Sequence, residues 1–506
     1  MSSPLRSLDW RFVLWPLAIF TLALAPRLVD LGTRSFWLDE ISTLNRASLS
    51  PAALAVDSFQ NHHMPWFFLL LAPFTHMAHP EFWMRFPSAV FGALSVVLVF
   101  MIASRIAGRL AGVLAALYLG LSPAALGFAQ EARSYTLVMT LILIGLYGVT
   151  RLAQEWRGAR VGWVCYIGGT ALSLAILGDS LPWFLAANLI FVCLLAFVPE
   201  PRRFIVRVLL ADLVILLVTL PLYMVMLHYQ LQDVATSLEW IPRLSFNQIW
   251  YSFGSVYLMR VPDWVSFRLL DHHAIPGIVW MIDLLLLAAL AGAVWRLRRR
   301  PEVLITYGIG FLFLPCLFLA ISVVHPVLLP RYLLWSSAPF AVLIGIGTET
   351  LLRKIPFAPG RLMTGRRVTV AAVAVLLVLN VLPYYKDELK PDWNQAAQKL
   401  AEDVKPGDVV MFSDTGAVPI LKFYLATSAD GLVLGSPYTS LSDAEQALKQ
   451  GKRVWVVYGH AGQNVSTHSS FMAQMQPLGT PLLFQKAGKR ITIWLYDPVT
   501  RLASGD

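Results

Sequence analysis

The sequence has little charge and very few cysteines. Only 14% of its 506 residues are charged, whereas 57% are hydrophobic; a water-soluble protein carries about 25% charged residues. This composition excludes a disordered chain, a nucleic-acid-binding arm and an ordinary cytosolic enzyme. The three cysteines, Cys165, Cys193 and Cys316, lie in apolar runs without a C-x-x-C or Cys/His spacing. They indicate neither a zinc site nor a disulfide framework.

Long apolar runs occupy the first 383 residues. Since about 20 apolar residues cross a bilayer as a helix, we predict eleven spans. They lie near residues 12–29, 86–104, 110–127, 135–150, 161–178, 181–198, 208–228, 275–295, 303–324, 332–352 and 368–383. The run Met64–Ala78 has only 15 residues and Pro65 at its start. We expect it to lie in the outer interface, as an amphipathic or re-entrant helix, without crossing.

Basic residues predict the orientation of these spans. The chain carries a net charge of +10, and 28 of its 40 Lys and Arg residues precede residue 384. Nineteen of these 28 fall on alternate connections, for example Arg296 and Arg298–Arg300, which the positive-inside rule makes cytoplasmic. The N-terminus is then inside and the C-terminus outside. The predicted outer face carries two large loops, residues 30–84 and 229–274.

Residues 384–506 have a different composition, with 12 basic and 12 acidic residues. A helix is predicted at Trp393–Val404 and another at Asp443–Lys449. Strands are predicted at Val409–Ser413, Lys452–Tyr458 and Arg490–Tyr496. Helices alternating with strands indicate a small α/β domain outside the membrane, so that residues 1–383 form the membrane module. This domain has no Gly-rich phosphate loop, and we place no chemistry there.

Acidic residues at the predicted outer face are candidates for a general base. Asp39 and Glu40 follow the first span by about ten residues and come directly after Phe36-Trp37-Leu38. Aromatic neighbours at the membrane surface would partly desolvate such a carboxylate and raise its pKa. Glu131 opens a later span, two residues before Arg133. A solvated loop and an interfacial cap are the alternative interpretations of these two motifs.

Cations at the same face are candidates for binding an anion. Arg331, in His325-Pro-Val-Leu-Leu-Pro-Arg331-Tyr332, meets the membrane against the positive-inside trend, as do Arg85 and Arg133. Arginine binds phosphate through two parallel N–H groups, so these residues suit a lipid phosphate. His62 and His63 stand just before the Met64–Ala78 run and could donate to the same anion. The alternative for Arg331 is a snorkelling anchor of its span.

The order of these motifs resembles a known family. It runs Trp37-Leu38-Asp39-Glu40, His63-Met-Pro65-Trp-Phe-Phe, Arg85-Phe-Pro-Ser88, Gln130-Glu131-Ala-Arg133-Ser-Tyr135 and Pro330-Arg331-Tyr332. Over roughly residues 10–350 the chain resembles the GT-C superfamily of polytopic glycosyltransferases. The most similar branch is the bacterial one (families 39 and 83) related to protein O-mannosyltransferases and to the lipid A aminoarabinose transferase. The resemblance implies an α-helical polytopic membrane protein in the bacterial inner membrane, with the C-terminal domain in the periplasm.

The resemblance also implies roles for particular residues. Asp39 matches the family's essential aspartate, with Glu40 as the adjoining acid, and Glu131 matches its second acid. Arg331 matches the arginine that binds the donor's phosphate, a role that His63, Arg133 and Tyr332 could share. Arg85 and His62 are assigned to the acceptor or to structure. The family often has His-Pro-Pro or Lys-Pro-Pro where this chain has His63-Met64-Pro65, which makes a fixed phosphate contact there less secure.

The implied reaction inverts the sugar's configuration as it leaves a polyprenyl-phosphate donor. Asp39 would act as general base for the acceptor, which is a glycolipid, a polysaccharide or a protein. No nucleotide or nucleic acid is expected, and a divalent cation between Asp39 and Glu131 is left open. The competing interpretation is a lipid or solute transporter without bond chemistry, but the sequence shows no inverted repeat of the kind that transporters use.

Overall fold

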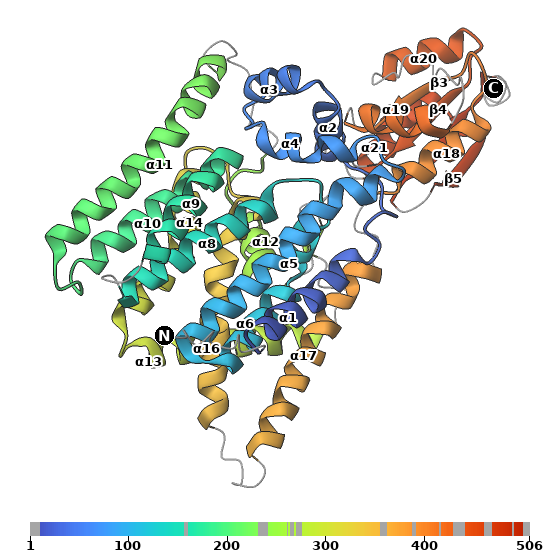
Figure 1. The fold of residues 1–506 in the computed structure, drawn as a ribbon. Coiled ribbons are helices and arrows are strands. Elements are labelled where there is room, and N and C mark those ends of the chain that lie inside the picture. The colour runs from blue at the N-terminus through green and yellow to red at the C-terminus, as the bar shows by residue number, and fades with distance from the viewer. Residues whose placement is uncertain are drawn as a thin grey trace.

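The computed structural model shows a mainly helical chain with a small sheet near its C-terminus (Figure 1). It describes residues 11–155, 160–230, 241–260, 262–263, 268–269, 276–354, 362–386, 391–413, 416–428, 441–459, 468–487 and 490–498. The helices of the membrane module pack side by side, and the C-terminal sheet lies at one end of the molecule (Figure 1). The described structure thus separates a helical bundle from a small α/β unit.

The predicted spans coincide with helices. These are α1 (Arg11–Leu28), α5 (Pro80–Ala107), α6 (Arg109–Gly120), α7 (Pro123–Ala129), α8 (Tyr135–Glu155), α9 (Arg160–Ile176), α10 (Leu181–Leu194), α11 (Pro201–Gln230), α13 (Pro276–Leu297), α14 (Pro301–Ser322), α16 (Ser337–Lys354) and α17 (Leu362–Lys386). Among the described residues, six helices are long and apolar enough to cross a membrane, or seven with one bent pair, and three more are apolar but shorter. The count of eleven crossings stays a prediction.

The predicted span over 110–127 is a pair of helices with a bend between them. Helix α6 ends at Gly120, and α7 begins at Pro123 with a bend of 64° between them. Proline fits the first turn of a new helix because it has no N–H to lose. Ser122 caps that turn by accepting a hydrogen bond from the Ala125 backbone N–H. The break turns the chain at the end of the bundle that carries the candidate site.

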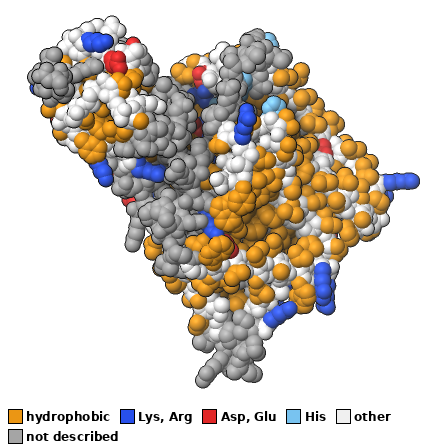
Figure 2. All heavy atoms as spheres, turned by 180° about the vertical axis from the view of Figure 1, so that it is seen from behind, with side chains coloured by type: hydrophobic (Ala, Val, Ile, Leu, Met, Phe, Trp, Pro, Cys, Tyr) orange, Lys and Arg blue, Asp and Glu red, His pale blue; other side chains and the backbone are white. Residues whose placement is uncertain are grey.

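Much of the helical surface is apolar. Helix α11 exposes Leu209, Leu213 and Leu217, each by more than half, and α13 exposes Trp280 and Leu284 similarly. Figure 2 shows hydrophobic side chains over most of one broad face, with Lys and Arg near its margins. An apolar surface of this extent is far larger than a soluble monomer tolerates. The protein is therefore a multi-pass membrane protein.

The predicted first outer loop folds into three short helices, α2 (Leu38–Ala47), α3 (Pro51–Gln60) and α4 (Trp66–Leu71). A 3-10 turn, η1 (Ala72–Phe74), follows α4, so the helical part of Met64–Ala78 has only nine residues. Nine residues cannot span about 30 Å of hydrocarbon. The second outer loop includes α12 (Phe246–Tyr257) and two paired two-residue strands, β1 (Pro262–Asp263) and β2 (Arg268–Leu269), and part of it lies outside the described residues.

The C-terminal unit contains a four-stranded sheet in the order β3-β4-β6-β5. Its elements are α18 (Trp393–Asp403), β3 (Val409–Phe412), α19 (Ala417–Ser428), α20 (Leu441–Lys449), β4 (Val454–Tyr458), α21 (His468–Met475), β5 (Leu483–Lys486) and β6 (Thr492–Tyr496). Strands β3 and β4 are parallel, and the other pairs are antiparallel. The predicted helices and strands are present within a few residues. The sequence pattern did not predict α19, α21 or β5, a short edge strand of alternating exposure.

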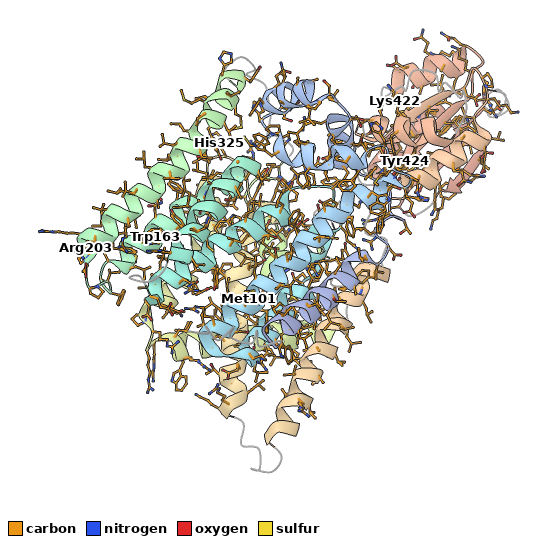
Figure 3. The ribbon with its side chains drawn as sticks, in the orientation of Figure 1. Met101, Trp163, Arg203, His325, Lys422 and Tyr424 are labelled. Atoms are coloured by element: carbon orange, nitrogen blue, oxygen red, sulfur yellow. The ribbon has the colours of Figure 1, made fainter. Side chains whose placement is uncertain are left out.

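The C-terminal unit contacts the first outer loop just before α2. The backbone N–H of Phe36 donates to Tyr424 Oη at 2.6 Å, and Ser35 Oγ donates to Asn394 Oδ1 at 2.7 Å. Tyr424, labelled in Figure 3, lies at this junction. Phe36 and Trp393 belong to one buried hydrophobic cluster. The segment that leads into Asp39 is thus anchored to the C-terminal unit.

Candidate active site

The first turn of α2 carries both adjacent acids. Carboxylates are favourable at this end of a helix, where unpaired N–H groups and the helix dipole are positive. Successive residues of a helix point about 100° apart. Asp39 and Glu40 therefore face different surroundings, although they are neighbours in the chain. Their partners come from different parts of the sequence.

Glu40 lies in a buried network with Arg85, which projects from α5. Arg85 Nε and Nη2 donate to the two carboxylate oxygens of Glu40 at 2.7 and 2.8 Å. The backbone N–H of Ala132 also donates to Glu40, at 2.9 Å. Arg85 further donates to the carbonyl oxygens of Leu31, Arg34 and Ser35. This network ties the first outer loop to α5 and to the segment before α8.

Asp39 forms an ion pair with Arg331, which lies on the four-residue helix α15 (Pro330–Leu333). Arg331 Nη1 donates to Asp39 Oδ2 at 3.0 Å. The two side chains are 17% and 27% exposed, so water and a substrate can reach the pair. Burial raises the pKa of Asp39, but the charges of Arg133 and Arg331 outweigh it and hold the pKa below its ordinary value. Asp39 is therefore ionised at neutral pH.

Arg133 brings a second guanidinium to the same place. Its Nη1 donates to Thr43 Oγ1 of α2 at 3.4 Å, and its guanidinium lies 5.7 Å from the centre of the Tyr135 ring. Burial opposes its charge, but Tyr135 and Asp39 raise the pKa of Arg133 above its ordinary value. The charges of Arg133 and Arg331 also act on each other. Arg133 and Arg331 thus place two guanidinium groups beside Asp39, and guanidinium groups suit an anion.

His63 lies beside this cluster, where its imidazole packs edge-on against Phe68 at 5.8 Å. Burial, together with the charges of Arg133 and Arg46, lowers the pKa of His63 to about 3. The imidazole is therefore neutral at neutral pH and can donate one N–H but no charge to an anion. His62, adjacent to it, adopts a left-handed backbone conformation with φ of 61°. The two histidines end the α3 segment and do not open a helix, because α4 begins at Trp66.

The remaining predicted residues lie close by. Tyr332 follows Arg331 on α15 and stacks on Phe318 of α14 with ring centres 5.6 Å apart. Its hydroxyl interacts electrostatically with Asp39. Glu131 is buried between α7 and α8, and its carbonyl oxygen accepts the N–H of Arg133 at 2.8 Å. The sequence prediction thus named residues from five segments: Asp39 and Glu40, His62 and His63, Arg85, Glu131 and Arg133, and Arg331 and Tyr332.

Asp179 is a site residue that the sequence prediction missed. It lies on the 3-10 turn η2 (Gly178–Ser180) between α9 and α10, and it interacts electrostatically with Arg331 and Arg133. One signal was available. Asp179 is the only charged residue between Arg160 and Glu200, and an isolated acid at the edge of an apolar stretch is a functional candidate.

The sequence left open whether a divalent cation binds between Asp39 and Glu131. Among the described residues, no group of three or more His, Cys, Asp and Glu side chains could hold a metal ion. Around Asp39 the nearby charged side chains are mainly arginines, which compete with a metal for the carboxylate. We therefore assign no step to a metal.

No family model and no curated protein matches the amino-acid sequence. Solved structures match the fold. ArnT, the lipid A aminoarabinose transferase, from Cupriavidus metallidurans superposes with a TM-score of 0.58 at 14% identity, over 97% of this chain and 99% of that one. The same protein bound to undecaprenyl phosphate gives a TM-score of 0.54 at 14% identity, over 96% and 98%.

The Archaeoglobus fulgidus oligosaccharyltransferase, tethered to an acceptor peptide, also superposes. Its TM-score is 0.51 at 12% identity, over 89% of this chain and 69% of that one. Both solved proteins are members of the GT-C superfamily. Identity this low establishes the architecture alone, and the agreement extends over nearly the whole chain. The chain therefore has the GT-C fold.

Proposed function

We propose that this protein is a membrane glycosyltransferase, which moves a sugar from a polyprenyl-phosphate donor to an acceptor at the outer face of the membrane. The observation that carries the proposal is the ion pair between Asp39 and Arg331, whose nitrogen and oxygen atoms are 3.0 Å apart although the two residues are 292 positions apart in the chain. Arg133 lies beside this pair. A water-accessible carboxylate next to two arginines provides a base and an anion site together. The solved ArnT with undecaprenyl phosphate supports a lipid phosphate as a ligand of this fold.

Asp39 acts as the general base. Its ionised carboxylate takes the proton from the acceptor's hydroxyl or amine as the acceptor oxygen or nitrogen attacks the anomeric carbon of the sugar. The bond from that carbon to the phosphate oxygen breaks in the same displacement. The products are a glycosylated acceptor of inverted configuration, a protonated Asp39 and a polyprenyl phosphate.

Arg331 and Arg133 hold the departing phosphate. A phosphate monoester leaves readily once its developing charge is stabilised, so no strong acid is needed. The two guanidinium groups provide this stabilisation, and neutral His63 can add one N–H. Arg331 then interacts with both the base and the leaving group. The donor's long isoprenoid chain requires an apolar path, which the lipid-facing helices provide.

Glu40 and Arg85 position the base in this proposal. Their carboxylate and guanidinium are buried and bonded to each other and to backbone groups, so they do not contact the substrate. Glu131 belongs to the segment that Glu40 holds through Ala132. We assign to it the orientation of the acceptor or of Arg133. This reassigns Glu40 from the predicted catalytic set to a positioning role.

The same proposal places the site at the periplasmic face of the bacterial inner membrane, with residues 384–506 as a periplasmic domain. The junction of Tyr424 with Phe36 supports it, because the C-terminal unit and Asp39 then lie on one side of the membrane. Reporter fusions after Arg300 and after Lys449 should report the cytoplasm and the periplasm respectively. The same location from both fusions contradicts this topology.

The test of function compares lipid extracts by mass. Cells lacking the protein are complemented with the wild type or with Asp39→Asn. We expect the deletion and Asp39→Asn cells to accumulate one polyprenyl-phosphate sugar and to lose one glycosylated product. Asp30→Asn, an exposed acid outside the site, is the matched control. Extracts that do not differ, while the variant is inserted at normal levels, reject the glycosyltransferase.

A further inference from the structure

A cavity of about 520 Å³ lies between the start of α5 and the C-terminal unit, outside the candidate active site. We call it the junction pocket. It is lined by residues at the start of α5, on α18 and on α19: His79, Pro80, Glu81, Asn394, Gln395, Gln398, Phe423 and Tyr424. Pockets that bind small molecules typically have volumes of about 300–1,000 Å³. The junction pocket is therefore large enough for a small ligand.

Short contacts fix the walls of the junction pocket against the segment before α2. Asn394, on α18, accepts the hydroxyl of Ser35 at its Oδ1 at 2.7 Å and donates its backbone N–H to Ser35 Oγ at 3.0 Å. On α19, Tyr424 Oη accepts the backbone N–H of Phe36 at 2.6 Å. The ring of Phe423 packs on that of Phe36 with centres 5.9 Å apart. The fold thus sets the shape of the pocket without a ligand.

The junction pocket has polar groups with unused hydrogen-bonding capacity. Glu81 lies in the first turn of α5, and no group of the described residues donates a hydrogen bond to its carboxylate or pairs with it. Gln395 and Gln398 are exposed on α18. Each uses its side-chain nitrogen for one acid, Asp392 at 3.4 Å and Glu402 at 3.2 Å respectively. The amide oxygens of both glutamines accept no hydrogen bond from the described residues, so they remain available to a ligand that donates.

The charge of the junction pocket differs from that of the candidate active site. No lysine or arginine lines it, whereas two arginines lie beside Asp39. A phosphate or carboxylate would meet no cation in the pocket and would be repelled by Glu81. Phe423 adds an apolar ring surface to the carboxylate and the amides. A sugar ring matches this combination, because its hydroxyl groups donate and accept hydrogen bonds while its C–H face can pack on an aromatic ring.

We propose that the junction pocket binds a saccharide unit of the acceptor, one that carries no phosphate or carboxylate. This inference rests on the proposed function and narrows the acceptor to a glycan-bearing molecule. The sugar of the donor is attached to the phosphate that Arg331 and Arg133 hold, which leaves the cation-free pocket to the acceptor. Phe36, which contacts the pocket wall, precedes Asp39 by three residues, a span of at most about 11 Å along the chain. An acceptor with more than one sugar unit is long enough to occupy the pocket and meet the base.

Saturation-transfer NMR on the full-length protein in nanodiscs measures the binding directly. The probes are glucose, glucosamine, N-acetylglucosamine and glucose 6-phosphate, of which the phosphate should bind most weakly. Glu81→Gln removes an ionised acceptor and should weaken the best-bound sugar by about tenfold, and Gln398→Ala should weaken it by about threefold. Lys422→Ala is the matched control, because Lys422 (labelled in Figure 3) is exposed on α19 but does not line the pocket. It should bind the sugars as the wild type does.

Three results overturn the sugar site. They are the absence of binding by all four probes, an unchanged affinity in both Glu81→Gln and Gln398→Ala, and a loss of the same size in Lys422→Ala. Glucose 6-phosphate as the best-bound probe also overturns it, since the pocket would then select an anion.

Lipid extracts from complemented cells test whether the bound sugar belongs to the acceptor. Cells with the double variant Glu81→Gln and Gln398→Ala should accumulate the same polyprenyl-phosphate sugar as Asp39→Asn cells. A double variant that binds sugar weakly but gives a wild-type extract means that the pocket binds a free sugar, which contradicts the proposal. An unchanged extract from Asp39→Asn cells, with sugar binding intact, refutes the proposed function and leaves the pocket as a sugar site.

Discussion

Two ion pairs begin one residue apart in the chain and have opposite surroundings. In the Glu40–Arg85 pair the side chains are 0% and 2% exposed, and backbone carbonyl oxygens accept the remaining guanidinium N–H groups. In the Asp39–Arg331 pair the side chains are 27% and 17% exposed. The first pair is buried, and its hydrogen bonds are made to other groups of the protein. The second faces a space that a substrate can enter.

This difference distinguishes an ion pair that stabilises the fold from an ion pair that a substrate can reach. A buried pair whose hydrogen bonds are all made within the protein resists change, because breaking it leaves an uncompensated charge. An accessible pair can exchange one partner for a ligand at small cost. Composition alone makes Asp39 and Glu40 equivalent, whereas the fold makes only Asp39 suitable as a base. Variants at Asp39, Arg85, Arg331 and Tyr424 test this comparison.

The largest effect is expected for Asp39→Asn. Asparagine keeps the size of the side chain but cannot take a proton, and the loss of a general base typically lowers kcat by about 10²–10⁴-fold. The melting temperature should hardly change, since the side chain is partly exposed. Turnover of polyprenyl-phosphate sugar in nanodiscs, with thermal unfolding in parallel, measures both. More than half of the wild-type turnover would exclude Asp39 as the base.

Arg85→Ala should mainly lower the stability of the protein, whereas Asp39→Asn should mainly lower kcat. It leaves the buried Glu40 carboxylate without its cation, and breaking a buried pair typically costs about 3–5 kcal/mol of stability. Thermal unfolding followed by tryptophan fluorescence measures the loss. The matched control is Arg85→Met combined with Glu40→Leu, which removes both charges and should recover part of the stability. If Arg85→Ala melts like the wild type, the pair does not hold the loop.

The sequence predicted the positions of Asp39 and Glu40 but not their ion-pair partners. Apolar runs and loop charges are local signals, so the helices and the outer acids could be found from them. The partner of Glu40 lies 45 residues away and the partner of Asp39 lies 292 residues away. Such pairings depend on how helices pack, which periodicity does not specify. The resemblance to GT-C proteins indicated Arg331 but did not indicate that it would contact Asp39.

Two other features were missed for local reasons. The run 110–127 is apolar throughout, so hydropathy treats it as one span, although Ser122-Pro123 is a helix start signal that breaks it. Asp179 was passed over because it stands alone, without a motif around it. Only the fold brings it near Arg133 and Arg331, which come from other parts of the chain. Isolated charges at span ends therefore merit the same attention as motifs.

The pH dependence of kcat/KM in Arg331 variants tests whether Arg331 keeps Asp39 ionised. Asp39 must be ionised to act, and Arg133 and Arg331 hold its pKa below the ordinary value. Wild-type kcat/KM should therefore show no acid limb from Asp39 above about pH 4. Arg331→Ala removes a cation and leaves the burial that raises the pKa of Asp39, so the acid limb should move to higher pH. Arg331→Lys keeps the charge and should keep the limb low.

The two Arg331 variants also separate charge from geometry. Lysine cannot reproduce the planar pair of N–H groups that binds phosphate, so donor KM should rise in both variants while acceptor KM stays constant. Profiles of kcat/KM from pH 4.5 to 8 provide the measurement. His63, with a pKa of about 3, titrates below this range and does not obscure the limb. An acid limb that is the same in all three proteins means that Arg331 does not set the ionisation of Asp39.

The smallest effect is expected where the C-terminal unit contacts the loop. Tyr424→Phe removes the hydroxyl that accepts the N–H of Phe36 at 2.6 Å and leaves that buried N–H unpaired, at a cost of about 1 kcal/mol or somewhat more. Because Phe36 precedes α2 by two residues, the loss should also lower kcat by a few-fold without changing donor affinity. Tyr496→Phe, in β6 of the same unit, is the matched control and should leave kcat unchanged. If both variants lose stability equally and neither changes kcat, the C-terminal unit contributes to folding but does not position Asp39.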